Sequence, residues 1–217
     1  MRAIENGYAI GKNIDLVKHF HDRGVIYMTL CHNGDNDICD SARGNSEHGG
    51  LSAFGRKVVK EMNRCGMMID LSHAAESTFY EVLEQSTAPV VCSHSSCKAL
   101  CDHPRNLDDR QIKALAAKGG VMQITMYSGF LRKEGEATLE DFMQHLEHAI
   151  SVAGIEHVGI GTDFDGDGAV KGCSSAAQLR NVTRELLRRG YSNGDIEKIW
   201  GGNWLRVMKQ VQESTQL

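Results

Sequence analysis

Five residues that can bind a metal ion or move a proton each lie at the end of a short apolar run of the sequence. They are Glu5, His32, His73, His94 and Asp163. If these runs are parallel strands, their carboxyl ends share one edge of a sheet, where the loops of a barrel build an active site. Imidazole nitrogens and a carboxylate oxygen are zinc ligands, and a carboxylate can bridge two metal ions. Asp163 can accept a proton beside such a metal. The set indicates a metal-dependent hydrolytic site.

The elements that must position these residues alternate along the chain. Five strands are predicted over Val25–Cys31, Met67–Leu71, Pro89–Ser93, Gly120–Met126 and His157–Thr162, with a sixth just before Asn6. Helices are predicted over Ile14–Arg23, Ser52–Cys65, Ala75–Ser86, Asp108–Lys118, Leu139–Ala153, Ala176–Arg189 and Ile196–Gln212. Thr138 and Asp141 resemble a capping box at the start of one of them. The alternation predicts an α/β fold with a parallel sheet, and both an open doubly wound sheet and a barrel satisfy it.

Three further residues have weaker signals. Arg105, in the string HPRN after a strand, can bind a substrate carboxylate through two hydrogen bonds, and a surface ion pair is an equally good interpretation. His145 and His148 lie three apart on a predicted helix, away from the strand ends. We interpret these two histidines as partner or surface residues rather than metal ligands.

Composition and charge exclude several classes of protein. The 217 residues carry 24 basic and 28 acidic side chains, a net charge of −4, and no basic stripe, so nucleic acid is not expected as a partner. No apolar run approaches the ~20 residues of a membrane-spanning helix. The seven cysteines are an odd number without a CxxC motif, which favours free thiols and a cytoplasmic location.

Several motifs together resemble a known family. IENG, TLCHNGDND, IDLSH, SHSS, HPRN and GTDFDG occur in order between Ala3 and Val207. They resemble the renal (membrane) dipeptidases, zinc peptidases of the metal-dependent amidohydrolase-like barrels. The resemblance implies a (β/α)8 TIM-type barrel, two zinc ions and a homodimer. It also implies hydrolysis of dipeptides that have a free C-terminal carboxylate, with tolerance of a C-terminal D-residue.

The resemblance assigns a role to each matching residue. Glu5 corresponds to the carboxylate that bridges the two zinc ions, and His73 and His94 to ligands of the second zinc. His32 corresponds to a histidine that contacts the substrate and polarises the scissile carbonyl. Arg105 corresponds to the residue that holds the substrate carboxylate. Asp163 corresponds to the acid/base that takes a proton from a zinc-bound water as the resulting hydroxide attacks.

One departure from the family pattern bears on activity. The family carries a His-x-Asp motif on its first strand, which supplies ligands to the first zinc. This sequence has no such motif before Glu5, because only four residues precede it. The string HFHD at residues 19–22 falls in a predicted helix. We therefore expect residues 1–217 to form a single domain, the C-terminal portion of an incomplete barrel with about six strands, its first two strands missing. We expect the chain alone to have impaired peptidase activity or none.

Two other functions stay open on the sequence. One is a different metal-dependent amidohydrolase of the deaminase or lactonase type, which would use the same barrel. The other is a non-catalytic remnant, which the absent His-x-Asp motif favours.

Overall fold

The computed structural model describes residues 1–216. The chain forms two compact units. The first comprises Met1–Cys92, Ala117–Gly120 and Arg206–Leu217, and the second comprises Ser93–Ala116 and Val121–Leu205. The single domain expected over residues 1–217 stays a prediction.

The strands confirm the predicted α/β class. They are β1 (Arg2–Glu5), β2 (Val25–Thr29), β3 (Met68–Asp70), β4 (Val91–Ser95), β5 (Val121–Ile124) and β6 (Val158–Ile160). Their order in the sheet follows the chain, and the strand pairs with a defined register are all parallel. Six parallel strands in chain order, with helices between them, are the arrangement expected for consecutive units of a (β/α)8 barrel.

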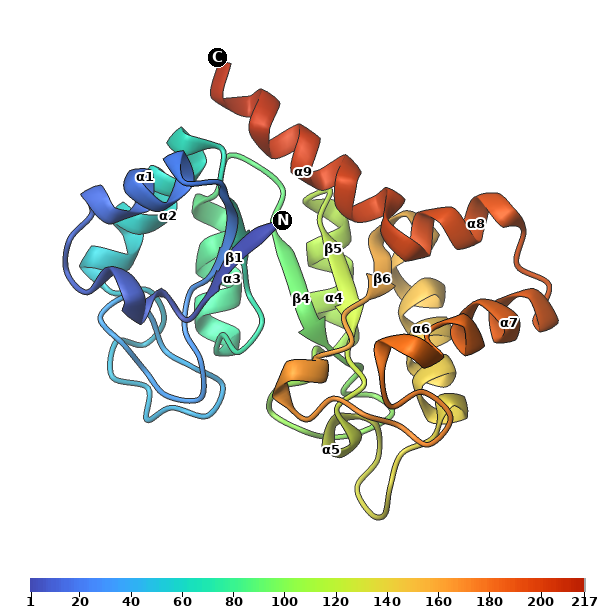
Figure 1. The fold of residues 1–217 in the computed structure, drawn as a ribbon. Coiled ribbons are helices and arrows are strands. Elements are labelled where there is room, and N and C mark those ends of the chain that lie inside the picture. The colour runs from blue at the N-terminus through green and yellow to red at the C-terminus, as the bar shows by residue number, and fades with distance from the viewer. Residues whose placement is uncertain (217) are drawn as a thin grey trace. The chain divides into compact units, whose positions relative to one another are not determined.

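One or more helices follow each strand along the chain. They are α1 (Asp15–Asp22), α2 (Ala53–Cys65), α3 (Glu76–Gln85), α4 (Asp109–Ala117), α5 (Ser128–Leu131), α6 (Leu139–Ala153), α7 (Arg180–Arg188), α8 (Asn193–Glu197) and α9 (Asn203–Glu213). In the first unit α1 and α2 lie side by side, and α2 also packs on β3 and α3 (Figure 1). In the second unit α6 packs on β5 and β6. None of the helices in the described part of the chain combines the length and apolar composition that crossing a bilayer requires.

The local sequence explains where α2 begins and ends. The Ser52 hydroxyl accepts a hydrogen bond from the backbone N–H of Gly55 at 2.9 Å, which caps the first turn. A Cβ on Gly55 would lie 2.0 Å from the Ile38 carbonyl oxygen, so glycine lets the helix approach the preceding loop closely. The helix stops at Gly66, whose φ of 73° is the left-handed conformation that glycine adopts without strain.

The start of α6 confirms the predicted capping box. The Thr138 hydroxyl accepts from the N–H of Asp141 at 3.3 Å, and the Asp141 carboxylate accepts from the N–H of Thr138 at 2.7 Å. Two otherwise unsatisfied donors are thereby paired at the helix start.

Three predicted elements were wrong in part. Strand β4 lies two residues later than the predicted Pro89–Ser93, and proline has no N–H to donate to a strand ladder. The predicted helix Ile196–Gln212 is interrupted by a π-helical turn, with non-helical φ and ψ of 175° and −17° at Gly201. The predicted helix Ala176–Arg189 is divided into a 3-10 turn over Ala176–Gln178 and the α-helix α7. The short helix α5 was not predicted.

Candidate active site

Glu5, His32 and His73 converge in the first unit. The His73 Nε2 atom lies 3.3 Å from Glu5 Oε1, and His32 Nε2 lies 3.9 Å from the same oxygen. The two imidazole rings have centroids 4.2 Å apart. One potential ligand atom from each residue lies within 4.8 Å of the other two. Three of the predicted site residues are therefore neighbours.

Strand register explains this convergence. Glu5, the last residue of β1, is paired with Thr29 of β2, and Thr29 is paired with Asp70 of β3. His32 and His73 each lie three residues beyond this row. Because the strands are parallel, their ends bring all three candidate side chains to one edge of the sheet.

The loop after β2, which carries His32, is held by its own polar side chains. The Ser41 hydroxyl donates to the His32 carbonyl oxygen at 2.5 Å. Asp35 accepts from the backbone N–H groups of Ser41 and Asn45 at 2.7 and 2.6 Å. Burial acts to raise the pKa of Asp35, but these and further backbone hydrogen bonds outweigh it and hold the pKa below its usual value. Asp35 is therefore an anionic anchor for the loop.

The three donors suit a divalent metal ion. The side chains of Glu5 and His32 are 45% and 43% exposed, while that of His73 is 7% exposed. The set thus combines one buried imidazole with two ligands open to solvent. A carboxylate and two imidazoles are a common zinc donor set, which leaves room for water or substrate at a catalytic metal. This donor set therefore fits zinc, although the family resemblance assigns His32 to the substrate and gives His94 as the other ligand.

His94, the other predicted zinc ligand, belongs to the second unit. It is buried and is the fourth of the five residues of β4, rather than following the strand. Its Nδ1 atom lies 2.8 Å from the Ser93 hydroxyl oxygen. This contact orients the ring and engages one of its two nitrogens.

Arg105 is buried in the same unit, which contradicts the interpretation as a surface ion pair. Its Nη2 atom donates to the His94 carbonyl oxygen at 3.3 Å, and its guanidinium carbon lies 5.3 Å from the centre of the Phe130 ring. The same ring packs on the His103 imidazole at 4.5 Å between centroids. Phe130 lies on the unpredicted helix α5, and no sequence pattern had singled it out.

Asp163 lies on a turn after β6 with a left-handed φ of 58°. Its carbonyl oxygen accepts from the N–H groups of Gly166 and Gly168 at 3.0 and 2.6 Å. A Cβ on Gly166 would lie 2.4 Å from Asp163 Oδ1, and one on Gly168 would lie 2.0 Å from the Thr162 carbonyl oxygen. The glycines of GTDFDGDG thus allow a tight loop around this carboxylate.

His145 is buried, so the surface alternative of that interpretation was wrong for this residue. It is 1% exposed, its Nδ1 accepts from the backbone N–H of Cys97 at 3.0 Å, and its Nε2 lies 3.0 Å from the Leu131 carbonyl oxygen. Burial lowers its pKa to about 4, so the ring is neutral near pH 7. His148 is part-buried and lies 2.7 Å from Asp109. The spacing of the two histidines gave no sign of their different burial.

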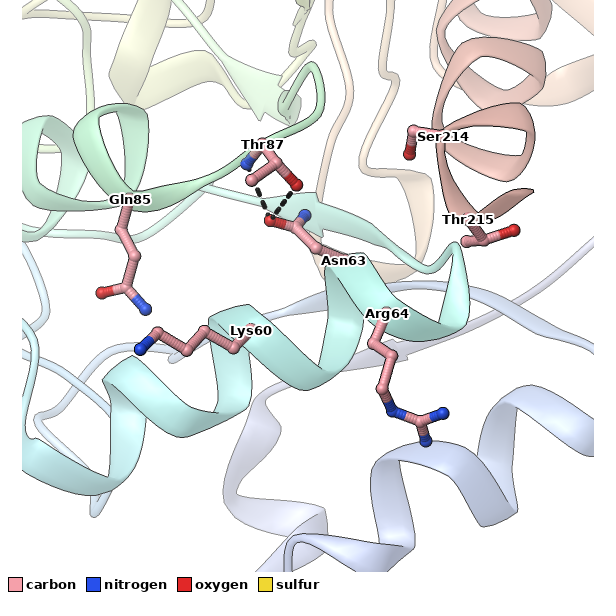
Figure 2. A pocket seen from close by; sticks show the side chains of 7 residues that line it. All are labelled: Lys60, Asn63, Arg64, Gln85, Thr87, Ser214 and Thr215. Carbon is pink, nitrogen blue, oxygen red and sulfur yellow. Dashed lines mark hydrogen bonds between the residues drawn. The ribbon is translucent and has the colours of Figure 1, made fainter. Parts of the chain in front are cut away.

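A separate hollow of about 350 Å³ lies in the first unit. It is lined by Lys60, Asn63, Arg64, Gln85, Thr87, Ser214 and Thr215 (Figure 2). The Lys60 and Arg64 side chains point in different directions in Figure 2, and Arg64 is engaged by Glu61 at 2.6 Å. This lining holds none of the predicted site residues, and we assign it no role in the chemistry.

Comparison with known proteins gives the family. The sequence profile described as membrane dipeptidase (peptidase family M19) matches residues 1–217. Dipeptidase verJ of Clonostachys rogersoniana is 42% identical over 215 residues, which cover 97% of this chain and 54% of that protein. Dipeptidase 3 of Rattus norvegicus is 35% identical over 216 residues, covering 97% and 44%. The chain spans about half the length of the curated relatives it matches.

Solved structures agree with the profile. The probable dipeptidase PvdM from Pseudomonas aeruginosa has a TM-score of 0.95 at 29% identity, covering 98% of this chain and 69% of that one. A metallopeptidase from Rhodobacter sphaeroides, liganded with a phosphinate mimic of the dipeptide L-Ala-D-Ala, has a TM-score of 0.89 at 29% identity, covering 95% and 62%. On the match over its full length, this chain belongs to the membrane dipeptidase family, peptidase family M19.

Proposed function

We propose that this chain carries the machinery of a zinc dipeptidase that hydrolyses dipeptides with a free C-terminal carboxylate. The observation that carries the proposal is the cluster of Glu5, His32 and His73 in a chain of the membrane dipeptidase family. A deaminase or lactonase function has less support, because the curated relatives reported above are dipeptidases.

Glu5, His73 and His94 are the residues that we assign to zinc. Bound zinc supplies a Lewis acid that polarises a carbonyl and lowers the pKa of a water. Glu5 offers a carboxylate that can bridge two ions, and its distance of 3.3 Å from His73 supports a shared metal site. His94 offers its Nε2, since Nδ1 faces Ser93.

Three residues act on the substrate and the water. His32 contacts the scissile carbonyl and stabilises the negative charge that develops on its oxygen. Asp163 accepts the proton of the attacking water and passes it to the leaving amine. Arg105 pairs with the substrate carboxylate, and this restricts the substrates to short peptides.

The substrate class extends to dipeptides with a D-residue at the C-terminal position. Support comes from the Rhodobacter sphaeroides relative, which was solved with a mimic of L-Ala-D-Ala.

We also propose that the protein is a homodimer, which light scattering checks. All seven cysteines are free thiols, which supports the proposed cytoplasmic location.

Zinc binding is the first test of this function. Elemental analysis of the purified, zinc-dialysed chain should give at least one equivalent of zinc, and Glu5→Gln and His73→Gln should each lower it. A phosphinate dipeptide mimic should then bind the zinc-loaded chain and not the chelator-treated one. Wild-type chain without zinc, or a preference for a lactone or cyclic amide over dipeptides, would contradict the proposal.

His32 needs its own variant, because its position allows two roles. We propose substrate contact, so His32→Gln should keep the zinc content and lose affinity for the phosphinate mimic. Loss of zinc from His32→Gln would make His32 a metal ligand instead, as the 3.9 Å distance to Glu5 also permits.

A further inference from the structure

A buried pair of side chains lies behind the Glu5, His32 and His73 cluster. Asp70, the last residue of β3, is fully buried, and Thr29 of β2 is 1% exposed. The Thr29 hydroxyl donates to Asp70 Oδ2 at 2.5 Å. We propose that Thr29 and Asp70 form a positioning unit for His73, which sets the affinity of the site for zinc. This inference rests on the proposed function.

The first support is the register of the sheet. Glu5, Thr29 and Asp70 are paired in one row across three strands. The hydrogen bond between Thr29 and Asp70 therefore ties the strand that precedes His73 to the strand next to Glu5. A displacement of β3 relative to β2 would change the distance between Glu5 and His73, which is 3.3 Å here.

The second support is the turn that follows β3. Asp70 Oδ1 accepts from the backbone N–H of Ser72 at 3.0 Å, so one carboxylate holds both the neighbouring strand and the chain just before His73. The N–H of Ala74 donates to the Leu71 carbonyl oxygen at 3.1 Å, closing the same turn. An aspartate that accepts from the N–H two residues later is a common way to fix a turn.

The third support is the backbone of His73 itself. Its φ of 72° is a left-handed conformation that a residue with a side chain seldom adopts, and it persists where the surroundings hold it. The N–H of Ala42 donates to the His73 carbonyl oxygen at 2.7 Å, which fixes the backbone of His73 itself. Asp70 fixes the backbone just before His73, through its hydrogen bond from Ser72. The orientation of the imidazole toward Glu5 depends on both.

The chemistry of metal sites gives the size of the effect. Groups that orient a ligand without touching the metal commonly change metal affinity by about 10–100-fold when they are removed. Asp70 is three residues from His73, and we assign it to positioning rather than to ligation. Its loss should therefore change the affinity for zinc and leave the number of zinc ions unchanged.

Thr29 offers a matched pair of variants. Thr29→Val keeps the size and branching of the side chain and removes the hydroxyl, whereas Thr29→Ser keeps the hydroxyl. The dissociation constant of Zn²⁺ alone is measured by competition with a chromophoric chelator, on the full chain. We expect Thr29→Val to weaken zinc binding about tenfold with unchanged stoichiometry, and Thr29→Ser to stay within about twofold of wild type.

Asp70→Ala is the second variant, and it should weaken zinc binding more than Thr29→Val because the hydrogen bonds to Thr29 and to Ser72 are both lost. If Asp70→Ala does not fold, the Thr29 pair decides alone. Thermal unfolding of the zinc-free variants separates a general loss of stability from a positioning role. A Thr29→Val chain that melts earlier but binds zinc as wild type does would overturn the inference and leave the proposed function intact. A wild-type chain that binds no zinc would overturn both.

Discussion

Arg105 Nη2 donates a hydrogen bond to the backbone carbonyl of His94 across 3.3 Å. This contact joins a proposed substrate-binding residue to the strand of a proposed zinc ligand, and Phe130 supports the guanidinium at 5.3 Å. A lysine cannot reproduce the planar fork of arginine. We expect Arg105→Lys to weaken binding of the phosphinate dipeptide mimic by about 10–100-fold, as the loss of charged hydrogen bonds would do. Isothermal titration calorimetry of the zinc-loaded chain measures the change.

Arg110→Lys is the matched control for this prediction, because Arg110 is 78% exposed and pairs with Asp108 at 3.0 Å. It should leave the affinity unchanged. Equal affinities of wild type and Arg105→Lys for the mimic would remove Arg105 from the proposed role.

Gly161 follows β6 at a place where no side chain fits. A Cβ there would lie 1.9 Å from the Ser93 carbonyl oxygen and 3.0 Å from the Gln123 side chain. Because the nearest atom belongs to the backbone of β4, it cannot move aside cheaply. Gly161→Ala should lower the free energy of unfolding by about 1–3 kcal/mol, as overpacking does. Urea denaturation followed by circular dichroism measures it.

Gly194, in α8, provides the comparison. The nearest atom to a Cβ at Gly194 is the Ser192 hydroxyl oxygen, 3.8 Å away. Gly194→Ala should leave stability unchanged or raise it by up to about 1 kcal/mol. Equal changes in the free energy of unfolding for the two glycine variants would mean that the close approach of Ser93 does not require glycine at position 161.

The strand ends could be predicted from sequence because parallel strands of apolar residues leave a clear pattern. Glu5, His32 and His73 were selected on this pattern, and they lie together in the first unit. Asp70 and Thr29 were not selected, because a buried carboxylate and hydroxyl within a strand look like ordinary strand residues until the register pairs them.

The burial of the two helical histidines and the break near the C-terminus were not predicted from the sequence, for different physical reasons. His145 and His148 are three residues apart on one helix, yet packing buries the first and leaves the second near Asp109. Helical spacing predicts which face of a helix a residue lies on. It does not predict which loops pack over that face and bury the residue. The predicted helix Ile196–Gln212 was extended across Gly201 because its apolar periodicity continues there, although the GGN string at this point is typical of a turn or cap.

Arg189 holds three carboxylates of the second unit. It pairs with Glu140 and Glu147 at 2.6 Å and with Glu185 at 2.8 Å, and its side chain is 13% exposed. Removing it leaves three anions near one another without their shared cation. Arg189→Met should therefore lower the free energy of unfolding by about 2 kcal/mol, less than the loss of one partner of a fully buried pair, because Glu140 and Glu147 are 55% and 37% exposed. Urea denaturation at low and high salt measures this, and the loss should shrink in high salt.

The neighbouring Arg188 is the control for Arg189. It pairs with Glu185 at 2.6 Å, but its side chain is 67% exposed. Exposed pairs contribute about 0–1 kcal/mol, so Arg188→Met should have a small effect. A comparable loss from both variants would mean that general surface charge, and not the shared contact of Arg189, explains the result.

Burial of His145 predicts a pH-dependent stability. The pKa of this ring is lowered to about 4 in the folded chain from an ordinary value of 6.5. Between these values the unfolded chain binds the proton and the folded chain does not, so stability falls as the pH drops from about 6.5 to 4. The slope contributed by His145 should approach 1.4 kcal/mol per pH unit near pH 5. His145→Gln should remove that slope, whereas His148→Gln, which replaces the part-buried neighbour, should keep it. Urea denaturation of the three proteins at pH 7, 6 and 5 measures the slopes, and a His145→Gln chain with the wild-type slope would show that another group titrates in this range.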